Sequence, residues 1–170
     1  SVDSNGRVER KNGSAKNVNL LNDLSATEWI AETVSVWTQR GLGQNHPHAR
    51  IEREHPAPFS YQDVARLIRF FTKAGDTVLD PFVGVGSTLK AGALQGRRGI
   101  GIELNRRYAE LAKKRLRLEV EDAPDVCWDQ KILVGDARQI LPKLPRESAQ
   151  LVVTSPPYWN ILHKEDHKAK

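Results

Sequence analysis

The feature that most constrains this chain is an alternation of short apolar runs with helical stretches, which begins at Thr77. The runs TVLD, GIGIE, KILVGDA and AQLVVTSPPY have the length and composition of strands, and helical patterns occupy residues 87–95 and 106–120. Strands that alternate with helices in this way pair as a parallel sheet. We therefore predict an α/β fold with a partial parallel sheet of about four strands and helices on both faces.

Two amphipathic helices are predicted ahead of the first strand. The first spans residues 26–39, and its apolar face consists of Trp29, Ile30, Thr33, Val34 and Trp37, with both tryptophans expected in the core. The second begins after the N-cap Ser60 and closes before Gly75, with an apolar stripe of Val64, Leu67, Ile68 and Phe71. Residues 1–24 are polar at their start, lack an apolar signal segment and predict a flexible N-terminal arm.

The composition excludes several classes of protein. The chain has 170 residues, 39% of them apolar, and contains no long uncharged run, so one packed domain is expected and a membrane span is not. A single cysteine, Cys127, excludes a disulfide framework and a multi-cysteine metal site, and favours a cytoplasmic protein. The histidines show no spacing typical of a metal site. The net charge of +5 suits a polyanionic partner.

Basic residues are clustered in the sequence on both sides of the second predicted strand, GIGIE. We expect these side chains to spread around a helix on a solvated face rather than to form a DNA track. They are Arg97, Arg98, Arg106, Arg107, Lys113, Lys114, Arg115 and Arg117.

A glycine-rich segment, DPFVGVGST, follows the first predicted strand. Ligands of open parallel sheets bind beyond the carboxyl ends of the strands, and Gly84 and Gly86 allow a close approach of the backbone. A pyrophosphate-binding fingerprint would need glycine where this chain has Leu89, so a nucleoside without phosphates fits better. Asp80 could cap the next helix or meet an ammonium group of the ligand, and the sequence leaves both roles open.

Two carboxylates close the next two predicted strands. Glu103 ends GIGIE and Asp136 ends ILVGD. A carboxylate can accept from both hydroxyls of a ribose, and another can accept from an adenine amino group. Acids at such positions also cap helices. For Asp136 the two interpretations weigh equally, and for Glu103 the ligand interpretation is favoured.

The fourth predicted strand runs into Ser155-Pro156-Pro157-Tyr158, at the same edge of the sheet as the glycines. Two prolines make the loop rigid and leave its carbonyl oxygens free to accept hydrogen bonds. Bonds from an exocyclic amine to the Ser155 hydroxyl and the Pro156 carbonyl would localise the lone pair of the amine for methyl transfer, while Tyr158 stacks on the base. Such a base must be flipped out of its duplex. Without the preceding motifs, the segment would indicate only a rigid turn.

These motifs resemble those of the amino-methylating DNA methyltransferases of bacterial restriction-modification systems, which carry FxGxG and (D/N/S)PP(Y/F/W) sequences. The resemblance runs from about residue 22 to 161 and implies a Rossmann-like fold, S-adenosylmethionine as cofactor and DNA as substrate. It makes residues 25–170 the N-terminal part of a catalytic domain. The implied catalytic residues are Ser155, Pro156, Pro157 and Tyr158. The implied cofactor-binding residues are Phe59, Asp80, Pro81, Phe82, Gly84, Gly86, Ser87, Thr88, Glu103, Asp136 and Thr154.

The segment HPAPF adds to this resemblance. In the family it helps to hold the methionine end of the cofactor, which extends that role to His55, Pro56 and Phe59. Phe59 also has a structural alternative, because it precedes the N-cap Ser60 and could pack on Val64.

The serine of SPPY is typical of enzymes that methylate cytosine N4, whereas Asp or Asn is more common in enzymes for adenine N6. Cytosine is therefore preferred, with adenine, guanine in RNA, and a non-catalytic cofactor- or DNA-binding subunit as alternatives. Enzymes that methylate carbon 5 of cytosine need a nucleophilic cysteine after a proline. The single cysteine, Cys127, lies between Val126 and Trp128, so this class is excluded.

The chain departs from the family pattern at its end, ten residues after Asn160. Family members carry further strands and a region that reads the DNA sequence. We expect a complementary polypeptide or a longer chain to supply them, since the last strand would otherwise leave an open edge. The resemblance also implies a bacterial or phage-encoded protein that acts at the nucleoid.

Overall fold

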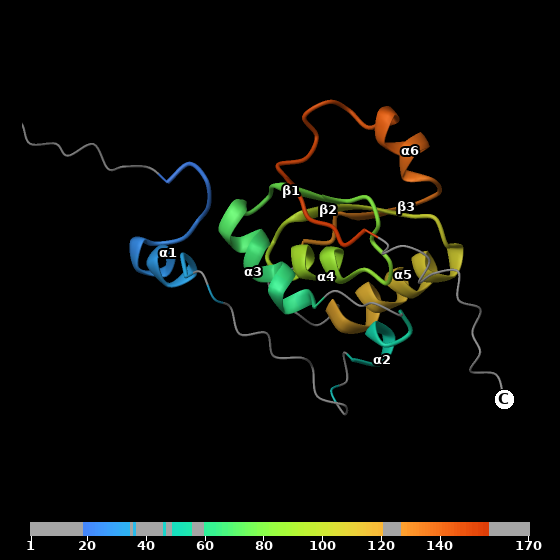
Figure 1. Cartoon of the computed structure of the whole chain (residues 1–170), viewed down its shortest axis with the longest axis horizontal. Coiled ribbons are helices and arrows are strands. Elements are labelled where there is room, and N and C mark those ends of the chain that lie inside the picture. The colour runs from blue at the N-terminus through green and yellow to red at the C-terminus, as the bar shows by residue number, and fades with distance from the viewer. Residues whose placement is uncertain are drawn as a thin grey trace, which may run out of the picture.

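The computed structural model describes residues 19–34, 36, 46, 49–55, 60–120 and 127–156. These residues form a parallel sheet of β1 (Thr77–Asp80), β2 (Arg98–Glu103), β3 (Gln130–Val134) and β4 (Leu151–Val152). The strand order is β3-β2-β1-β4 (Figure 1). The first strand therefore lies inside the sheet, with β2 and β3 on one side of it and β4 on the other. The prediction of four parallel strands is confirmed.

Helices lie on both sides of this sheet. Figure 1 shows α3 (Tyr61–Phe71), α4 (Ser87–Leu94) and α5 (Arg106–Val120) below the strands, and α6 (Ala137–Ile140) above them. A short 3-10 helix, Leu141–Lys143, continues α6. The order 3-2-1-4 is that of the first four strands in a doubly wound Rossmann-like sheet. Among the described residues, no helix is long and apolar enough to cross a bilayer.

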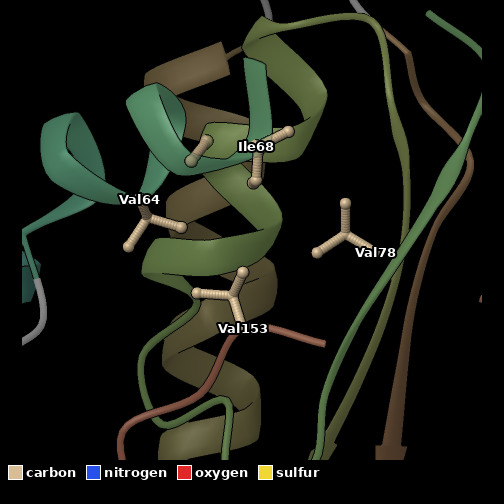
Figure 2. Packing of buried hydrophobic residues seen from close by; sticks show 5 residues of the cluster. Val64, Ile68, Val78 and Val153 are labelled. Carbon is tan, nitrogen blue, oxygen red and sulfur yellow. The ribbon is translucent and has the colours of Figure 1, made fainter. Parts of the chain in front are cut away.

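The core lies between the sheet and α3 and α4. Val64 and Ile68 of α3 pack with Val78 of β1, Ala91 of α4 and Val153 after β4 (Figure 2). Val64 and Ile68 are one turn apart, and Ser60 stands at the N-cap as predicted, but its side chain forms no capping hydrogen bond. The cluster joins β1 to the β4 side of the sheet, because Val78 lies on β1 and Val153 directly follows the neighbouring strand β4.

The first helix is shorter and more exposed than predicted. α1 (Ala26–Glu32) starts with a reciprocal capping box between Ser25 and Glu28 and has no buried residue. Trp29 is half-buried against Phe70, with ring centroids 4.8 Å apart, whereas Ile30 is 71% exposed. The predicted apolar face is therefore not buried in the described residues, and Trp37 lies outside them.

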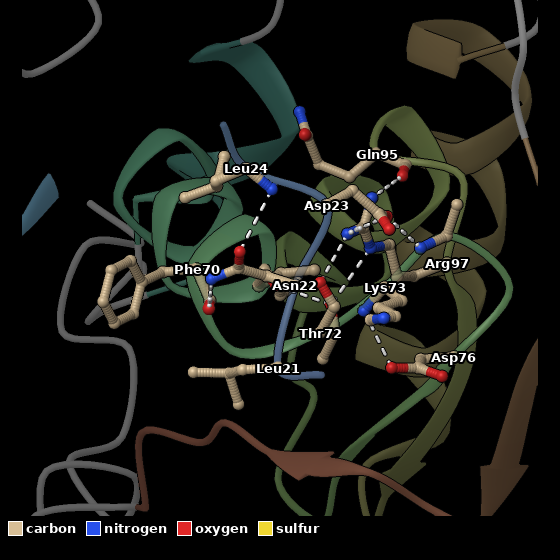
Figure 3. Close-up of polar contacts among 12 residues, drawn as sticks. Leu21, Asn22, Asp23, Leu24, Phe70, Thr72, Lys73, Asp76, Gln95 and Arg97 are labelled. Carbon is tan, nitrogen blue, oxygen red and sulfur yellow. Dashed lines mark hydrogen bonds and ion pairs between the residues drawn. The ribbon is translucent and has the colours of Figure 1, made fainter. Parts of the chain in front are cut away.

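Residues 19–24, which were assigned to the flexible arm, are packed on the end of α3 (Figure 3). The side-chain amide of Asn22 donates to the carbonyl of Phe70 at 2.5 Å, and the Asn22 side chain is buried. The Asp23 carboxylate accepts from the backbone N–H of Ala74 at 2.7 Å. Packing against α3 thus begins before α1, and the remainder of the predicted arm, residues 1–18, lies outside the described residues.

Two of the basic residues that were predicted to be solvated are buried. The Arg97 guanidinium donates to the hydroxyl and the carbonyl of Thr72, at 3.0 and 2.7 Å, and to the carbonyl of Gln95 (Figure 3). Arg115 on α5 is fully buried among α2 (Ala49–Glu52), α4 and α5. The prediction was wrong for both because each guanidinium finds partners that lie far away in the sequence.

Candidate active site

Predicted ligand-binding groups follow each strand at one edge of the sheet. Asp80 and Glu103 end β1 and β2, Asp136 follows β3, and Ser155 follows β4. All four strands are parallel, so their carboxyl ends lie at the same edge. The topology therefore brings these four side chains to one side of the molecule.

The glycine turn between β1 and α4 is held in a conformation that favours glycine. Gly84 and Gly86 have φ angles of +53° and +86°, and Gly86 is the N-cap of α4. A Cβ at Gly86 would lie 3.0 Å from the Cβ of Ala112 on α5. The turn is anchored to β2 by the backbone N–H of Val83, which donates to the carbonyl of Ile102 at 3.0 Å.

His55 covers the first glycine of the turn. A Cβ at Gly84 would lie 3.2 Å from Nε2 of His55, so the imidazole packs directly on the backbone there. The same ring also lies edge-on to Tyr108 on α5, with 5.0 Å between the ring centroids. The structure therefore brings one residue of the HPAPF segment to the glycine turn. The other members, Pro56 and Phe59, lie outside the described residues.

Asp80 is buried beneath the turn and is only 3% exposed. Its Oδ1 accepts from the backbone N–H of Phe82 at 3.0 Å and from the Thr154 hydroxyl at 2.7 Å, and its Oδ2 accepts from the Thr88 hydroxyl. Burial raises the pKa of this carboxyl, and the hydrogen bonds from Thr88, Thr154 and Phe82 oppose that rise. Asp80 does not cap α4, whose N-cap is Gly86; its buried side chain instead accepts from the hydroxyl of Thr88 on the first turn of that helix.

Ser87 and Thr88, at the start of α4, are also buried. The Ser87 hydroxyl accepts from Arg115 at 2.9 Å, and the same guanidinium reaches Glu52 at 2.6 Å and Glu119 at 2.9 Å. Arg115 thereby links α2, which precedes His55 in the sequence, to the first turn of α4. The two hydroxyls point into the protein and support the glycine turn from below.

Glu103 faces the turn from the end of β2 and is half-buried. Its Oε2 accepts from the backbone N–H of Gly84 at 2.9 Å, and its Oε1 accepts from the backbone N–H of Asn105 at 2.8 Å. A carboxylate offers about four lone-pair positions. Each oxygen therefore retains capacity for another donor, which is what two neighbouring ribose hydroxyls would supply.

Asp136 occupies the N-cap of α6 and accepts from the backbone N–H of Arg138 at 2.9 Å. The Arg138 side chain pairs with both of its oxygens, and this pairing lowers the pKa of Asp136. Arg138 itself is largely exposed. The capping role foreseen for Asp136 is thus present, and its side chain, which is 23% exposed, stays accessible to another donor.

The predicted catalytic loop starts at Ser155, which is half-buried like the preceding Thr154, while Pro156 is exposed. Pro157 and Tyr158 lie outside the described residues. Two apolar side chains, Phe82 (44% exposed) and Leu104 (72% exposed), accompany the carboxylates. Leu104 is not among the predicted site residues, although it directly follows Glu103 in the sequence.

Comparison with known proteins identifies the family. The sequence model of a family of N6 and N4 methyltransferases, described as DNA methylase, matches residues 5–114, which include the glycine turn and Glu103. The chain belongs to this DNA methylase family. The matched segment ends before Ser155, so the prediction of a catalytic loop rests on the SPPY motif and on its place after β4.

Individual relatives of this methylase chain are type II methyltransferases. M.MthZI of Methanothermobacter thermautotrophicus is 36% identical over 52% of the chain and 24% of its own length, and M.BglI of Bacillus subtilis is 39% identical over 55% and 25%. The matches therefore span about a quarter of these curated relatives. A solved putative DNA modification methylase of Thermus thermophilus, TTHA0409 in complex with S-adenosyl-L-methionine, is 34% identical. The match covers 59% of this chain and 45% of that one, with a TM-score of 0.40.

Proposed function

We propose that this chain forms the cofactor site and catalytic loop of an enzyme that transfers a methyl group from S-adenosylmethionine to an exocyclic amine of DNA, with cytosine N4 as the preferred acceptor. The observation that carries this proposal is the arrangement around Glu103, whose carboxylate is oriented by the Gly84 and Asn105 amides at the edge where Ser155 also lies. Membership of the DNA methylase family agrees with it.

The residues present fit the nucleoside part of the cofactor. Glu103 would accept hydrogen bonds from the ribose hydroxyls, and Asp136 would accept one from the adenine amino group. Phe82 and Leu104 offer exposed apolar surface for the adenine ring. The backbone of the glycine turn would border the methionine part, while His55 and Ala112 pack where Gly84 and Gly86 lack a Cβ. No group in this set calls for a phosphate.

We assign Asp80, Ser87 and Thr88 to the support of this site rather than to direct contact, because all three side chains are buried. Bound S-adenosylmethionine supplies an electrophilic methyl group on a sulfonium. The Ser155 hydroxyl and the Pro156 carbonyl would accept hydrogen bonds from the target amine, and Tyr158 would stack on the base. These bonds localise the amine lone pair and orient it towards the methyl group.

Among the described residues, β4 is an outer strand of the sheet, and its edge belongs to the proposal as well. Val152 on this strand is 56% exposed, in contrast to the buried centre of the sheet. We propose that further strands, from the same polypeptide or from a complementary one, cover this edge and bring the region that reads the DNA sequence.

Titration calorimetry and methyl transfer together test the proposed function in the complete protein. We expect S-adenosylmethionine to bind both the wild type and Ser155→Ala, and labelled methyl to pass to DNA only with the wild type. Labelling of tRNA instead of DNA would move the substrate to RNA. Methylation of DNA that persists in Ser155→Ala combined with Tyr158→Ala would place catalysis elsewhere.

A further inference from the structure

The Thr154 hydroxyl and the Asp80 carboxylate join the ends of β1 and β4 at the point where backbone pairing stops. The two strands pair through Val78 with Leu151 and Leu79 with Val152, and the backbone N–H of Val153 donates to the carbonyl of Leu79 at 3.1 Å. One residue further on, Thr154 Oγ1 donates to Asp80 Oδ1 at 2.7 Å. A side-chain hydrogen bond thus continues the connection up to the residue before Ser155.

The Asp80 carboxylate also accepts hydrogen bonds from the glycine turn and from α4. Its Oδ1 also accepts from the backbone N–H of Phe82, which enters the glycine turn, and its Oδ2 accepts from the hydroxyl of Thr88 on α4. One buried carboxylate therefore connects the glycine turn, the first turn of α4 and the start of the catalytic loop. Hydrogen bonds to an ionised acceptor are stronger and better defined in geometry than neutral ones.

We propose that Asp80 is a positioning residue that sets the catalytic loop relative to the cofactor turn through Thr154. This inference rests on the proposed function, in which the turn holds the methyl donor and the loop holds the acceptor amine. Methyl transfer requires the two reacting atoms to be aligned at about 3–3.5 Å, and a displacement of 1 Å can lower a rate by about 100-fold. A link between the two halves of the site controls that separation.

Thr154→Val tests this link, because valine keeps the shape of threonine and replaces the hydroxyl with a methyl group. In the complete protein at saturating cofactor and DNA, we expect the rate of a single turnover to fall by about 10- to 100-fold. The dissociation constant of S-adenosylmethionine should stay within about twofold, because the Thr154 hydroxyl donates to the buried Asp80 carboxylate, a supporting contact in place of the cofactor contact that the resemblance implied for Thr154. Thr154→Ser keeps the hydroxyl and should restore most of the rate.

Thr88→Val is the matched comparison, since it removes a hydrogen bond from the same carboxylate on the cofactor side. We expect it to raise the dissociation constant of the cofactor and to lower the saturated rate less than Thr154→Val does. In an Asp80→Asn background, Thr154→Val should have a smaller effect than in the wild type, because the two residues act as a unit.

The outcomes separate this inference from the proposed function. A wild-type rate in Thr154→Val, or equal losses of rate and melting temperature in both valine variants, would overturn the positioning role while the methyltransferase assignment stands. A wild-type protein that binds S-adenosylmethionine but methylates no nucleic acid would overturn both.

Discussion

Glu103 and Gly84 are joined by a hydrogen bond of 2.9 Å, in which the backbone N–H of the glycine donates to the carboxylate at the end of the neighbouring strand. The bond fixes the acid in the place where a ribose would need it. It also ties the glycine turn to β2, next to the backbone bond from Val83 to Ile102.

Glu103→Gln should weaken cofactor binding. Glutamine replaces one carboxylate oxygen with an NH2 group that cannot accept a hydrogen bond, and it removes the negative charge. Hydrogen bonds to a charged acceptor contribute about 1.5–3 kcal/mol, so we expect a rise in the dissociation constant of about 10-fold or more. Asp129→Asn is the control, because Asp129 precedes β3 at the opposite edge of the sheet. Calorimetry with S-adenosylmethionine measures both, and equal affinities in the two variants would remove Glu103 from the site.

Gly84→Ala should lower both stability and cofactor affinity. The left-handed backbone costs a non-glycine residue about 1–2 kcal/mol, and the new methyl group would meet His55 at 3.2 Å. Gly75→Ala provides a matched comparison, since Gly75 has a φ of +83° and no neighbour within 4 Å. We expect both variants to lose stability on urea unfolding and only Gly84→Ala to lose affinity. Unchanged affinity in Gly84→Ala would show that the turn does not face the cofactor.

Glu119→Ala should destabilise the fold strongly. The Glu119 carboxylate accepts from both Lys90, at 2.7 Å, and Arg115, at 2.9 Å, and both cations are fully buried. Removing the shared partner of buried charges costs about 3–5 kcal/mol. Glu110→Ala, which breaks an exposed pair with Lys113, should cost less than about 1 kcal/mol. Similar losses for the two variants in denaturant unfolding would contradict the buried network.

The pH dependence of stability should carry a contribution from Asp80. Burial raises its pKa in the folded state above the ordinary value of 3.8, so the folded protein holds this proton more tightly than the unfolded chain. The stability that protonation contributes is therefore lost as the pH rises from 3.8 through the raised pKa. Asp80→Asn lacks this titration. The free energy of unfolding of Asp80→Asn minus that of the wild type should grow with pH over this window, and a constant or falling difference would be inconsistent with the raised pKa.

Much of the fold could be predicted from local patterns. The helix at residues 106–120 and the strands that end at Asp80 and Glu103 follow from apolar spacing alone. Parallel pairing then places the carboxylates at one edge, because side chains at the carboxyl ends of parallel strands share that edge. The position of the candidate site therefore followed from topology rather than from any single motif.

The contacts that support the site could not be predicted in the same way. Arg115 is buried because Glu52, 63 residues earlier, and Ser87 reach its guanidinium. Asp80 turned inward because Thr154, 74 residues later, donates to it. No local pattern reports such partners. α1 also ended earlier than its apolar periodicity indicated, since Trp29 packs on Phe70 while Ile30 faces solvent.

The most direct test of the central claim is mass spectrometry of the nucleosides from DNA that has been incubated with the complete protein and S-adenosylmethionine, with Ser155→Ala as the paired control. We predict N4-methylcytosine with the wild type and none with the variant. N6-methyladenine would correct the acceptor base while leaving the reaction in place. DNA without any methylated amine, from a folded wild-type protein that binds the cofactor, would contradict the claim.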